Sequence, residues 1–224
     1  MELSDNTIQV LKNFASINQN IVIDSGHCVK TISEAKNIMS EATIDTEFAQ
    51  TFGIYDLNEF LNVIGLVDGA QLRFDQNHVL VGDSSGRARA KYFFSSPDIL
   101  TTPNKPIQMP SPEVTFHLSN ETLNKVKRAA SVLGHDEVSV TVVDNVICLS
   151  VVDSQDTSSN VFSVDVSGEY ESEDFSFILK IDNLRVVPGD YTVQMSSKLI
   201  SHFQNDNAPI QYWIALETTS TYGE

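Results

Sequence analysis

Apolar residues recur at helical spacing in three stretches of the chain, residues 4–18, 56–67 and 119–133. The third is the clearest, because Ser119 can cap its first amides and Gly134 can end it. Its apolar side comprises Leu123, Val126, Ala130 and Leu133. Asp56 with Glu59 predicts a capped start for the second helix. A shorter helical turn fits residues 182–187.

Alternation of apolar and polar positions predicts β-strands between these helices. The predicted strands span 21–24, 27–33, 37–45, 47–54, 70–75, 78–81, 87–94, 137–143, 146–152, 160–166, 175–181, 191–196, 199–204 and 210–217. Residues 169–174 are expected to form a solvated loop and residues 218–224 a loose tail. Strands dominate, with few helices, so the fold class is α+β.

A proline-rich segment divides this pattern in two. Residues 96–112 carry five of the seven prolines, and proline cannot donate to a central β-ladder. The segment therefore predicts a connector between domains 1–95 and 113–224. Both halves show a helix, several strands, a second helical segment and three strands, which favours a duplicated domain.

The charge distribution singles out the third helix. The chain has 14 Lys and Arg against 30 Asp and Glu, with a net charge of -16. Lys125 and Arg128 nevertheless lie opposite the apolar side of this helix, with Lys127 at its flank. A solvated face is the simplest explanation; the alternative is local contact with a polyanion on a chain that otherwise repels nucleic acid.

Several chemistries lack support in the sequence. No apolar run is long enough to span a bilayer, and the N-terminus lacks the features of a secretory signal. Cys28 and Cys148 fit a reducing compartment and are expected to be small core residues. The five histidines lack metal-ligand spacing, and the glycine-bounded segment 82–86 fits a hairpin turn better than a phosphate loop. We therefore expect no metal, cofactor or catalytic site.

Four stretches closely resemble the sliding clamps of T-even bacteriophages, the processivity factors of the phage DNA polymerases. They are residues 11–18 (LKNFASIN), 54–61 (IYDLNEFL), 103–107 (PNKPI) and 214–217 (IALE). The resemblance runs from the first helix to the last strand and is weakest around residues 153–172. It also departs from the family at Asp5, where T-even clamps have Lys.

The resemblance implies a closed ring of three chains, similar to the eukaryotic proliferating-cell clamp. Each chain would contribute two similar domains, each with two helices packed on antiparallel sheets. The helices would line a hole around duplex DNA and hold it without reading its sequence. An ATP-driven clamp loader and the DNA polymerase are the implied partners in the host cytoplasm, and late-transcription proteins are candidates for the same docking platform.

The resemblance also implies two sets of site residues. The DNA-facing set comprises Lys12, Lys125, Lys127, Arg128, Arg185, Asn13, Asn58 and Asn62. The set for a partner peptide comprises Ile107, Met109, Pro110, Tyr212, Ile214 and Leu216. Strand alternation puts the last three on one face, with Trp213 and Ala215 in the core, but periodicity favours the opposite assignment equally well.

The resemblance suggests, by analogy of position, that residues 87–94 of one chain pair with residues 160–166 of the next. A different class of function, an acidic β-rich virion or assembly protein without a role in nucleic-acid binding, also fits the repeat and the solubility. This alternative does not explain why the third helix gathers Lys125, Lys127 and Arg128 on a chain that is otherwise acidic.

Overall fold

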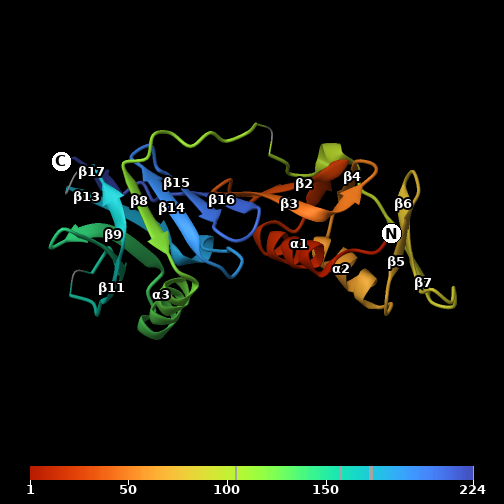
Figure 1. Cartoon of the computed structure of the whole chain (residues 1–224), viewed down its shortest axis with the longest axis horizontal. Coiled ribbons are helices and arrows are strands. Elements are labelled where there is room, and N and C mark those ends of the chain that lie inside the picture. The colour runs from red at the N-terminus through yellow and green to blue at the C-terminus, as the bar shows by residue number, and fades with distance from the viewer. Residues whose placement is uncertain (104, 157, 172–173, 224) are drawn as a thin grey trace. The chain divides into compact units, whose positions relative to one another are not determined.

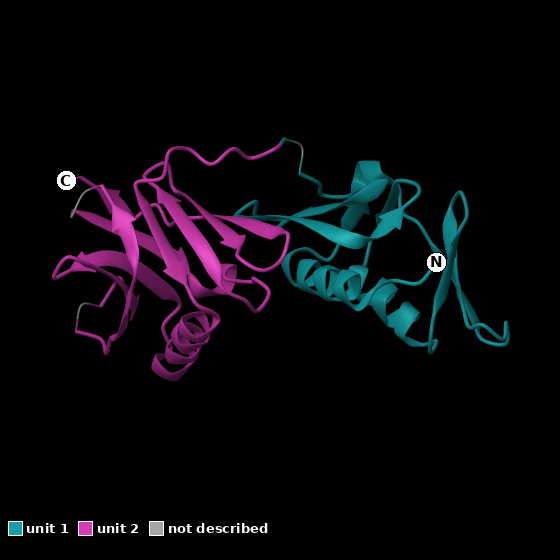
Figure 2. Ribbon diagram, in the orientation of Figure 1, with its two compact units in different colours: residues 1–105 teal, residues 106–224 magenta. Residues whose placement is uncertain are grey.

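The computed structural model describes residues 1–103, 105–156, 158–171 and 174–223. The chain forms two compact units, residues 1–105 and 106–224 (Figure 2). The boundary between them falls inside the proline-rich segment. Each unit combines α-helix with antiparallel sheet, which confirms the α+β class.

Among its described residues, the first unit contains two α-helices, seven strands and one 3₁₀ turn (Figure 1). Their bounds are α1 (Asp5–Ile17), β1 (Ile21–Ile23), β2 (Gly26–Ile32), β3 (Ile38–Phe48), β4 (Phe52–Ile54), α2 (Leu57–Gly65), β5 (Gln71–Phe74), β6 (His78–Gly82), β7 (Arg89–Phe93) and η1 (Pro97–Ile99). Strand β2 pairs with β3, β1 pairs with β4, and β5, β6 and β7 form a three-stranded sheet in that order. All of these pairings are antiparallel.

The helices of the first unit begin where the sequence predicts. The Ser4 hydroxyl accepts a hydrogen bond from the Thr7 amide at 3.1 Å, and an Asp56 carboxylate oxygen accepts one from the Glu59 amide at 3.0 Å. Each bond satisfies an amide that the first helical turn leaves without a partner. Helix α1 packs against β3 and α2 and buries Leu11 and Phe14 completely.

Strand β3 is longer than predicted. The expected break near Thr46 is wrong, because Ile44, Thr46 and Phe48 continue the buried face of one strand. Thr46 is tolerated there because its hydroxyl accepts a hydrogen bond from the Thr7 hydroxyl at 3.0 Å. The reversal of the chain comes after Phe48 instead.

The second unit contains one α-helix, ten strands and one 3₁₀ turn within the part of the chain that the structure describes. Their bounds are β8 (Val114–Leu118), α3 (Asn120–Leu133), β9 (Glu137–Val143), β10 (Val146–Val152), β11 (Phe162–Val166), β12 (Gly168–Tyr170), β13 (Phe175–Lys180), η2 (Ile181–Asn183), β14 (Tyr191–Ser196), β15 (Ile200–Asn205), β16 (Ile210–Ala215) and β17 (Thr221–Tyr222). One sheet has the order β11-β10-β9-β13-β17, and β12, β8, β14, β15 and β16 are neighbours in a second.

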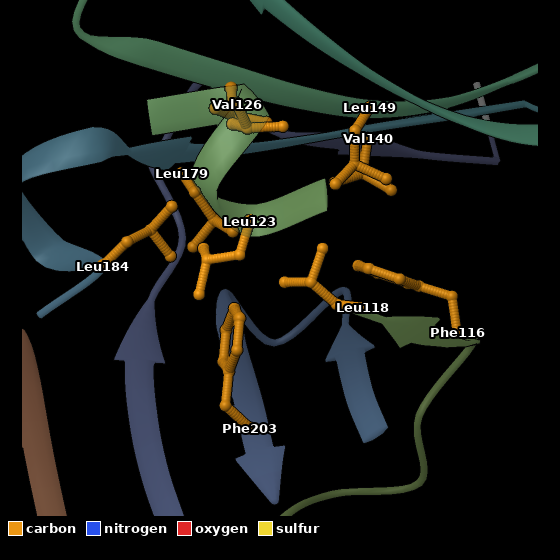
Figure 3. Close-up of a pocket in the computed structure, with 10 residues that line it drawn as sticks. Phe116, Leu118, Leu123, Val126, Val140, Leu149, Leu179, Leu184 and Phe203 are labelled. Carbon is orange, nitrogen blue, oxygen red and sulfur yellow. The ribbon is translucent and has the colours of Figure 1, made fainter. Parts of the chain in front are cut away.

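Helix α3 closes the core between these two sheets. Figure 3 shows Leu123 and Val126 of α3 facing Leu149, Leu179 and Phe203 from both sheets. The space left among these side chains is only about 10 Å³, so the core is closely packed. The helix starts at the Ser119 cap and ends at Gly134, whose φ of 73° suits a residue without a Cβ atom.

The resemblance implied a second helix in this unit, and for the described residues that prediction is wrong. Residues 182–187 hold only the end of the 3₁₀ turn η2. Val187 precedes Pro188, which disfavours helical geometry at Val187, and Pro188 itself cannot donate to a helical hydrogen bond. The described part of the chain therefore has three α-helices rather than four.

Other departures from the sequence pattern involve short strands. Strand β8 lies directly after the prolines, β12 lies within the expected loop 169–174, and β17 lies in the expected loose tail. Both β12 and β17 are short and lie beside a longer strand, so local alternation carries little signal. Part of the expected loop, residues 172 and 173, lies outside the described residues.

Candidate nucleic-acid interface

Helix α3 presents the largest group of the expected DNA-facing cations. Lys125 and Arg128 are exposed, and the opposite side of the helix is buried through Leu123 and Val126. The Lys125 ammonium lies 2.7 Å from a Glu121 carboxylate oxygen, one helical turn earlier. This bond lowers the pKa of Glu121 and offsets part of the positive charge of Lys125.

Lys127 has a different environment from the other two cations. It is half-buried, and burial lowers the pKa of its ammonium below the usual value. Desolvation disfavours the charged form, so Lys127 is less suited than Arg128 to an open contact with phosphate. Sequence spacing had placed it at the flank of the helix, which is compatible with this partial burial.

The first unit offers a mostly uncharged polar surface on its helices. Lys12 is exposed on α1, and Asn13 beside it is half-exposed. Asn58 and Asn62 are exposed on α2, on the side opposite the buried Leu57 and Phe60. Amide side chains and a single cation can contact phosphate oxygens without binding them tightly, and they provide no sequence readout by that route.

Arg185 lies on an irregular segment rather than on a helix. Its side chain is exposed, and its Nε donates a hydrogen bond of 2.8 Å to the Asp182 carbonyl. The residue remains a candidate contact to DNA, now held by the turn at η2.

Strand β16 faces the opposite way from the predicted assignment. Tyr212 and Ile214 are fully buried, and Leu216 is also buried. Tyr212 lies beside Phe203 in the strand ladder and 6.3 Å from the ring of Tyr191, both of them core residues. The assignment of these three residues to an open peptide pocket is therefore a prediction that the structure contradicts, because the closely packed core requires their side chains.

The other face of β16 carries Trp213 and Ala215. Trp213 stacks on His202 of β15 with ring centroids 5.1 Å apart, and burial lowers the pKa of His202. The indole nitrogen of Trp213 is buried without a hydrogen-bond partner among the described residues. The sequence pattern could not select this face, because both faces of the strand are apolar.

The connector residues Ile107, Met109 and Pro110 are half-buried rather than fully exposed. The chain after them is anchored by Glu113, which accepts hydrogen bonds from the Ser197 hydroxyl and amide at 2.6 and 2.9 Å. Burial opposes the charge of Glu113, but these bonds outweigh it and hold the pKa of the carboxyl below its usual value. The three connector residues therefore lie just before the point where Glu113 attaches the chain to the hairpin of β14 and β15.

Strands β7 and β11 each lie at one end of a sheet. Among the described strands, β7 pairs only with β6, and β11 pairs only with β10. An unpaired edge exposes a row of backbone donors and acceptors that a further strand can bind. These are the two strands that the resemblance suggests pair between neighbouring copies, by analogy of position.

The two cysteines differ. Cys148 is buried as expected, but Cys28 is exposed on β2, so its assignment to the core is wrong. Burial of the thiol itself, together with nearby carboxylates, raises the pKa of Cys28, which makes it a poor nucleophile. No group of three or more His, Cys, Asp or Glu side chains among the described residues could hold a metal ion.

None of the described helices combines the length and the apolar character needed to cross a membrane.

Two family models match the chain in succession. Residues 4–84 match the DNA polymerase processivity factor family, and residues 115–218 match the family described as gp45 sliding clamp, C terminal. Together these matches cover both units.

Solved structures of other clamps share the fold. The Proliferating Cellular Nuclear Antigen of Entamoeba histolytica has a TM-score of 0.66 at 13% identity, with 95% of each chain covered. A chain of the PCNA2-PCNA3 complex from Sulfolobus tokodaii has a TM-score of 0.69 at 12% identity, with 97% of this chain and 98% of that chain covered. At these identities the likeness shows the fold alone.

Sequence relatives extend over almost the entire chain. The sliding clamp of Vibrio phage KVP40 is 31% identical over 222 residues, covering 97% of this chain and 99% of that protein. The sliding clamps of Enterobacteria phage T4 and Escherichia phage RB69 are 30% and 29% identical, with 99% of each chain covered. The chain therefore belongs to the sliding-clamp family of DNA polymerase processivity factors.

Proposed function

We propose that three copies of this chain close into a ring around duplex DNA and tether a phage replicative DNA polymerase. The observation that carries the proposal is the end-to-end match to phage sliding clamps. The exposed cations of α3, on a chain of net charge -16, supply the local attraction for phosphate that such a ring requires. The ring acts by topology and position, and it has no catalytic role.

The DNA-facing set consists of Lys12, Lys125, Arg128 and Arg185 as cations, Lys127 as a weaker contributor, and Asn13, Asn58 and Asn62 as polar lining. Few cations and several amides suit a surface that must slide, since each tight phosphate contact would slow movement along the backbone. The acidic exterior of the chain would discourage DNA from binding outside the ring.

Partner peptides are proposed to dock beside the connector. Ile107, Met109 and Pro110 remain the candidates from the connector, and the half-buried Ala215 is the candidate from β16. The half-buried apolar side chains of the connector suit a short segment that adds apolar contacts. The polymerase, an ATP-driven clamp loader and late-transcription proteins are the proposed partners, in the cytoplasm of the infected host.

The test combines assembly with activity. Light scattering should give about three times the chain mass of 24.8 kDa, and synthesis on primed circular DNA should become processive only when clamp loader and ATP are added. A monomer or an open polymer without any effect on the polymerase would support the virion or assembly alternative instead.

A further inference from the structure

Positive charge gathers on the sheet of β5, β6 and β7 in the first unit (Figure 1). Arg87, Arg89 and Lys91 lie close together in the sequence of a chain whose net charge is -16, and all three side chains are exposed. The described residues provide no ion pair for any of the three. Their charge is therefore available to another molecule.

The cations of β7 lie on the side of the strand that faces away from the core. Side chains alternate along the strand, so Arg89, Lys91 and Phe93 are exposed together on one side. Tyr92 points to the other side and packs on Phe60 of α2, with ring centroids 5.2 Å apart. The first side is open to solvent, and Phe93 is 62% exposed there.

Apolar surface lies directly beside these cations. The Lys91 ammonium lies 5.5 Å from the centre of the Phe93 ring, and Phe93 is the cross-strand partner of His78, with ring centroids 5.7 Å apart. Leu80, which is half-buried, lies across from Lys91 on β6. Arginine and aromatic side chains that are exposed together are typical of interaction surfaces.

The carboxylate closest in sequence to these cations is held inside the β6–β7 hairpin. Asp83 accepts hydrogen bonds from the Ser85 hydroxyl at 2.8 Å and from the Arg87 amide at 3.1 Å. The bond from Ser85 and those from the hairpin amides lower the pKa of Asp83. Asp83 therefore serves the turn itself, and the Arg87 guanidinium extends beyond it without an ion pair among the described residues.

Strand β5 differs from β7 in its local charge balance. Its one cation, Arg73, lies between Gln71 and Asp75 along the chain. Gln71 donates a hydrogen bond of 3.2 Å to a Glu2 carboxylate oxygen. Two carboxylates thus lie near Arg73, so the uncompensated charge of this sheet is concentrated along β7.

We propose that a basic face, defined as Arg87, Arg89, Lys91, Leu80 and Phe93, binds an extended acidic peptide of a partner protein. Alternate residues of a strand are about 7 Å apart on one side, and alternate side chains of an extended peptide have the same spacing. Carboxylates at every second position of the peptide can therefore each meet a cation of the face. Leu80 and Phe93 accommodate one apolar side chain of the peptide.

The size of the basic face favours a peptide over nucleic acid. The distance along the chain from Arg87 to Phe93 is at most about 20 Å. A single-stranded nucleic acid commonly occupies about 4–16 nucleotides on one binding fold, so it would extend beyond the face onto acidic surroundings that repel it. A short peptide keeps its charges within the roughly 8 Å over which the cations act at physiological salt.

This inference does not depend on the proposed ring. The basic face uses side chains of β7, whereas a pairing between copies would use the backbone edge of that strand. Binding to a single copy is therefore sufficient to measure it. Arg89 is left unchanged in the test, because it also lies beside the edge that a ring would use.

Fluorescence anisotropy of a labelled synthetic peptide tests the proposal. The peptide has about eight residues, with glutamate at every second position and one leucine. We expect Lys91→Gln and Phe93→Ser each to weaken binding about threefold or more, and higher salt to weaken binding to the parent protein. Both side chains are exposed, so the fold should survive, and circular dichroism verifies it.

Three matched controls accompany these variants. Lys36→Gln removes an exposed lysine from the turn between β2 and β3, and Val143→Ser removes an apolar side chain that is 53% exposed in the second unit. Both should bind the peptide as the parent does. A peptide with glutamine in place of glutamate should bind at least about tenfold more weakly, because it has lost every carboxylate.

Three results would overturn the proposal. The first is equal binding of the glutamate and glutamine peptides, and the second is unchanged affinity in both Lys91→Gln and Phe93→Ser. The third is an oligothymidylate of similar length that binds more tightly than the glutamate peptide and loses affinity in the same two variants, which would assign the basic face to nucleic acid. Each of these results leaves the proposed ring unaffected.

Discussion

Lys125 and Arg128 show how context changes two cations of the same helix. The Lys125 ammonium pairs with a Glu121 carboxylate oxygen at 2.7 Å, whereas Arg128 borders an apolar groove beside Val132 and Phe162. An arginine retains its charge in partly desolvated surroundings better than a lysine does. Arg128 is therefore the stronger candidate for contact with phosphate, and Lys127, with a pKa lowered by burial, the weaker.

The double change Lys125→Ala/Arg128→Ala should weaken loading or processive synthesis about fivefold or more at moderate salt, because each lost phosphate contact removes a salt-dependent part of the binding. The measurement is primer extension on circular DNA at several salt concentrations, with light scattering to verify that the trimer persists. Lys36→Gln/Arg73→Gln, two exposed cations outside both the proposed DNA-facing set and the connector, is the control. Undiminished loading and synthesis in the α3 double variant would remove these cations from the DNA-facing set.

A buried ion pair in the second unit gives a pH-dependent prediction. Burial opposes ionisation of Glu137, but the Lys180 ammonium at 2.8 Å holds the pKa of Glu137 below its usual value. The Glu137 and Asp136 carboxylates in turn raise the pKa of Lys180 to about 12. Glu137 therefore contributes stability above its unfolded pKa near 4.5, and Lys180 contributes it until the pH rises towards 12.

Lys180→Met should lower the free energy of unfolding by about 1–2 kcal/mol at pH 7, a discounted value because a third of the Lys180 side chain is exposed. The deficit should shrink near pH 4, where Glu137 can take up a proton and become neutral. Urea unfolding at both pH values measures it. Lys30→Met, which breaks the more exposed pair with Glu41, should cost about 0.5 kcal/mol or less; an equal cost for both variants would show that burial of Glu137 has no role.

At the scale of elements, the helices were the easiest to predict. Each has a side-chain cap at its start and a strong apolar side, and both signals are local in sequence. The implied fourth helix failed for an equally local reason, since Val187 precedes a proline and the chain cannot continue as a helix there. Short strands such as β12 and β17 were missed because their partners, rather than their own residues, define them.

The edge strands β7 and β11 carry opposite charges on the faces directed away from the helices. Strand β7 exposes Arg89 and Lys91 there, and β11 exposes Asp165. Backbone pairing alone would allow several registers and partners, whereas charge complementarity favours the pairing of β7 with β11 over pairing of like edges.

Reversal of either charge should weaken assembly. Arg89→Glu and Asp165→Arg should each raise the concentration for half-assembly about three- to tenfold, and the combined variant should recover part of the loss. Analytical ultracentrifugation of the three variants measures the effect. Additive losses in the combined variant would show that the two side chains do not face each other across the contact between copies.

At the scale of the whole molecule, a net charge of -16 and a cationic helix have complementary roles. Long-range repulsion keeps nucleic acid away from most of the surface, and screening at physiological salt limits each local attraction to roughly 8 Å. A clamp that slides needs this combination of a topological hold and weak local contact. Because the family match covers both units, we expect each copy in the proposed ring to combine a topological hold with weak local contact.

The sequence by itself determined the α+β class, the capped helices and, through a resemblance in four short stretches, the clamp family. These features depend on residues close together in the chain, where spacing and side-chain chemistry are sufficient. The tertiary structure decided which face of β16 enters the core, that Cys28 is exposed and that an apolar groove remains open beside β11. Such features depend on packing between distant segments. Tyr212 and Trp213 are neighbouring apolar residues in one strand, and it is Tyr212 that packs with Phe203 on the adjoining strand β15 and with Tyr191 on β14 beyond it.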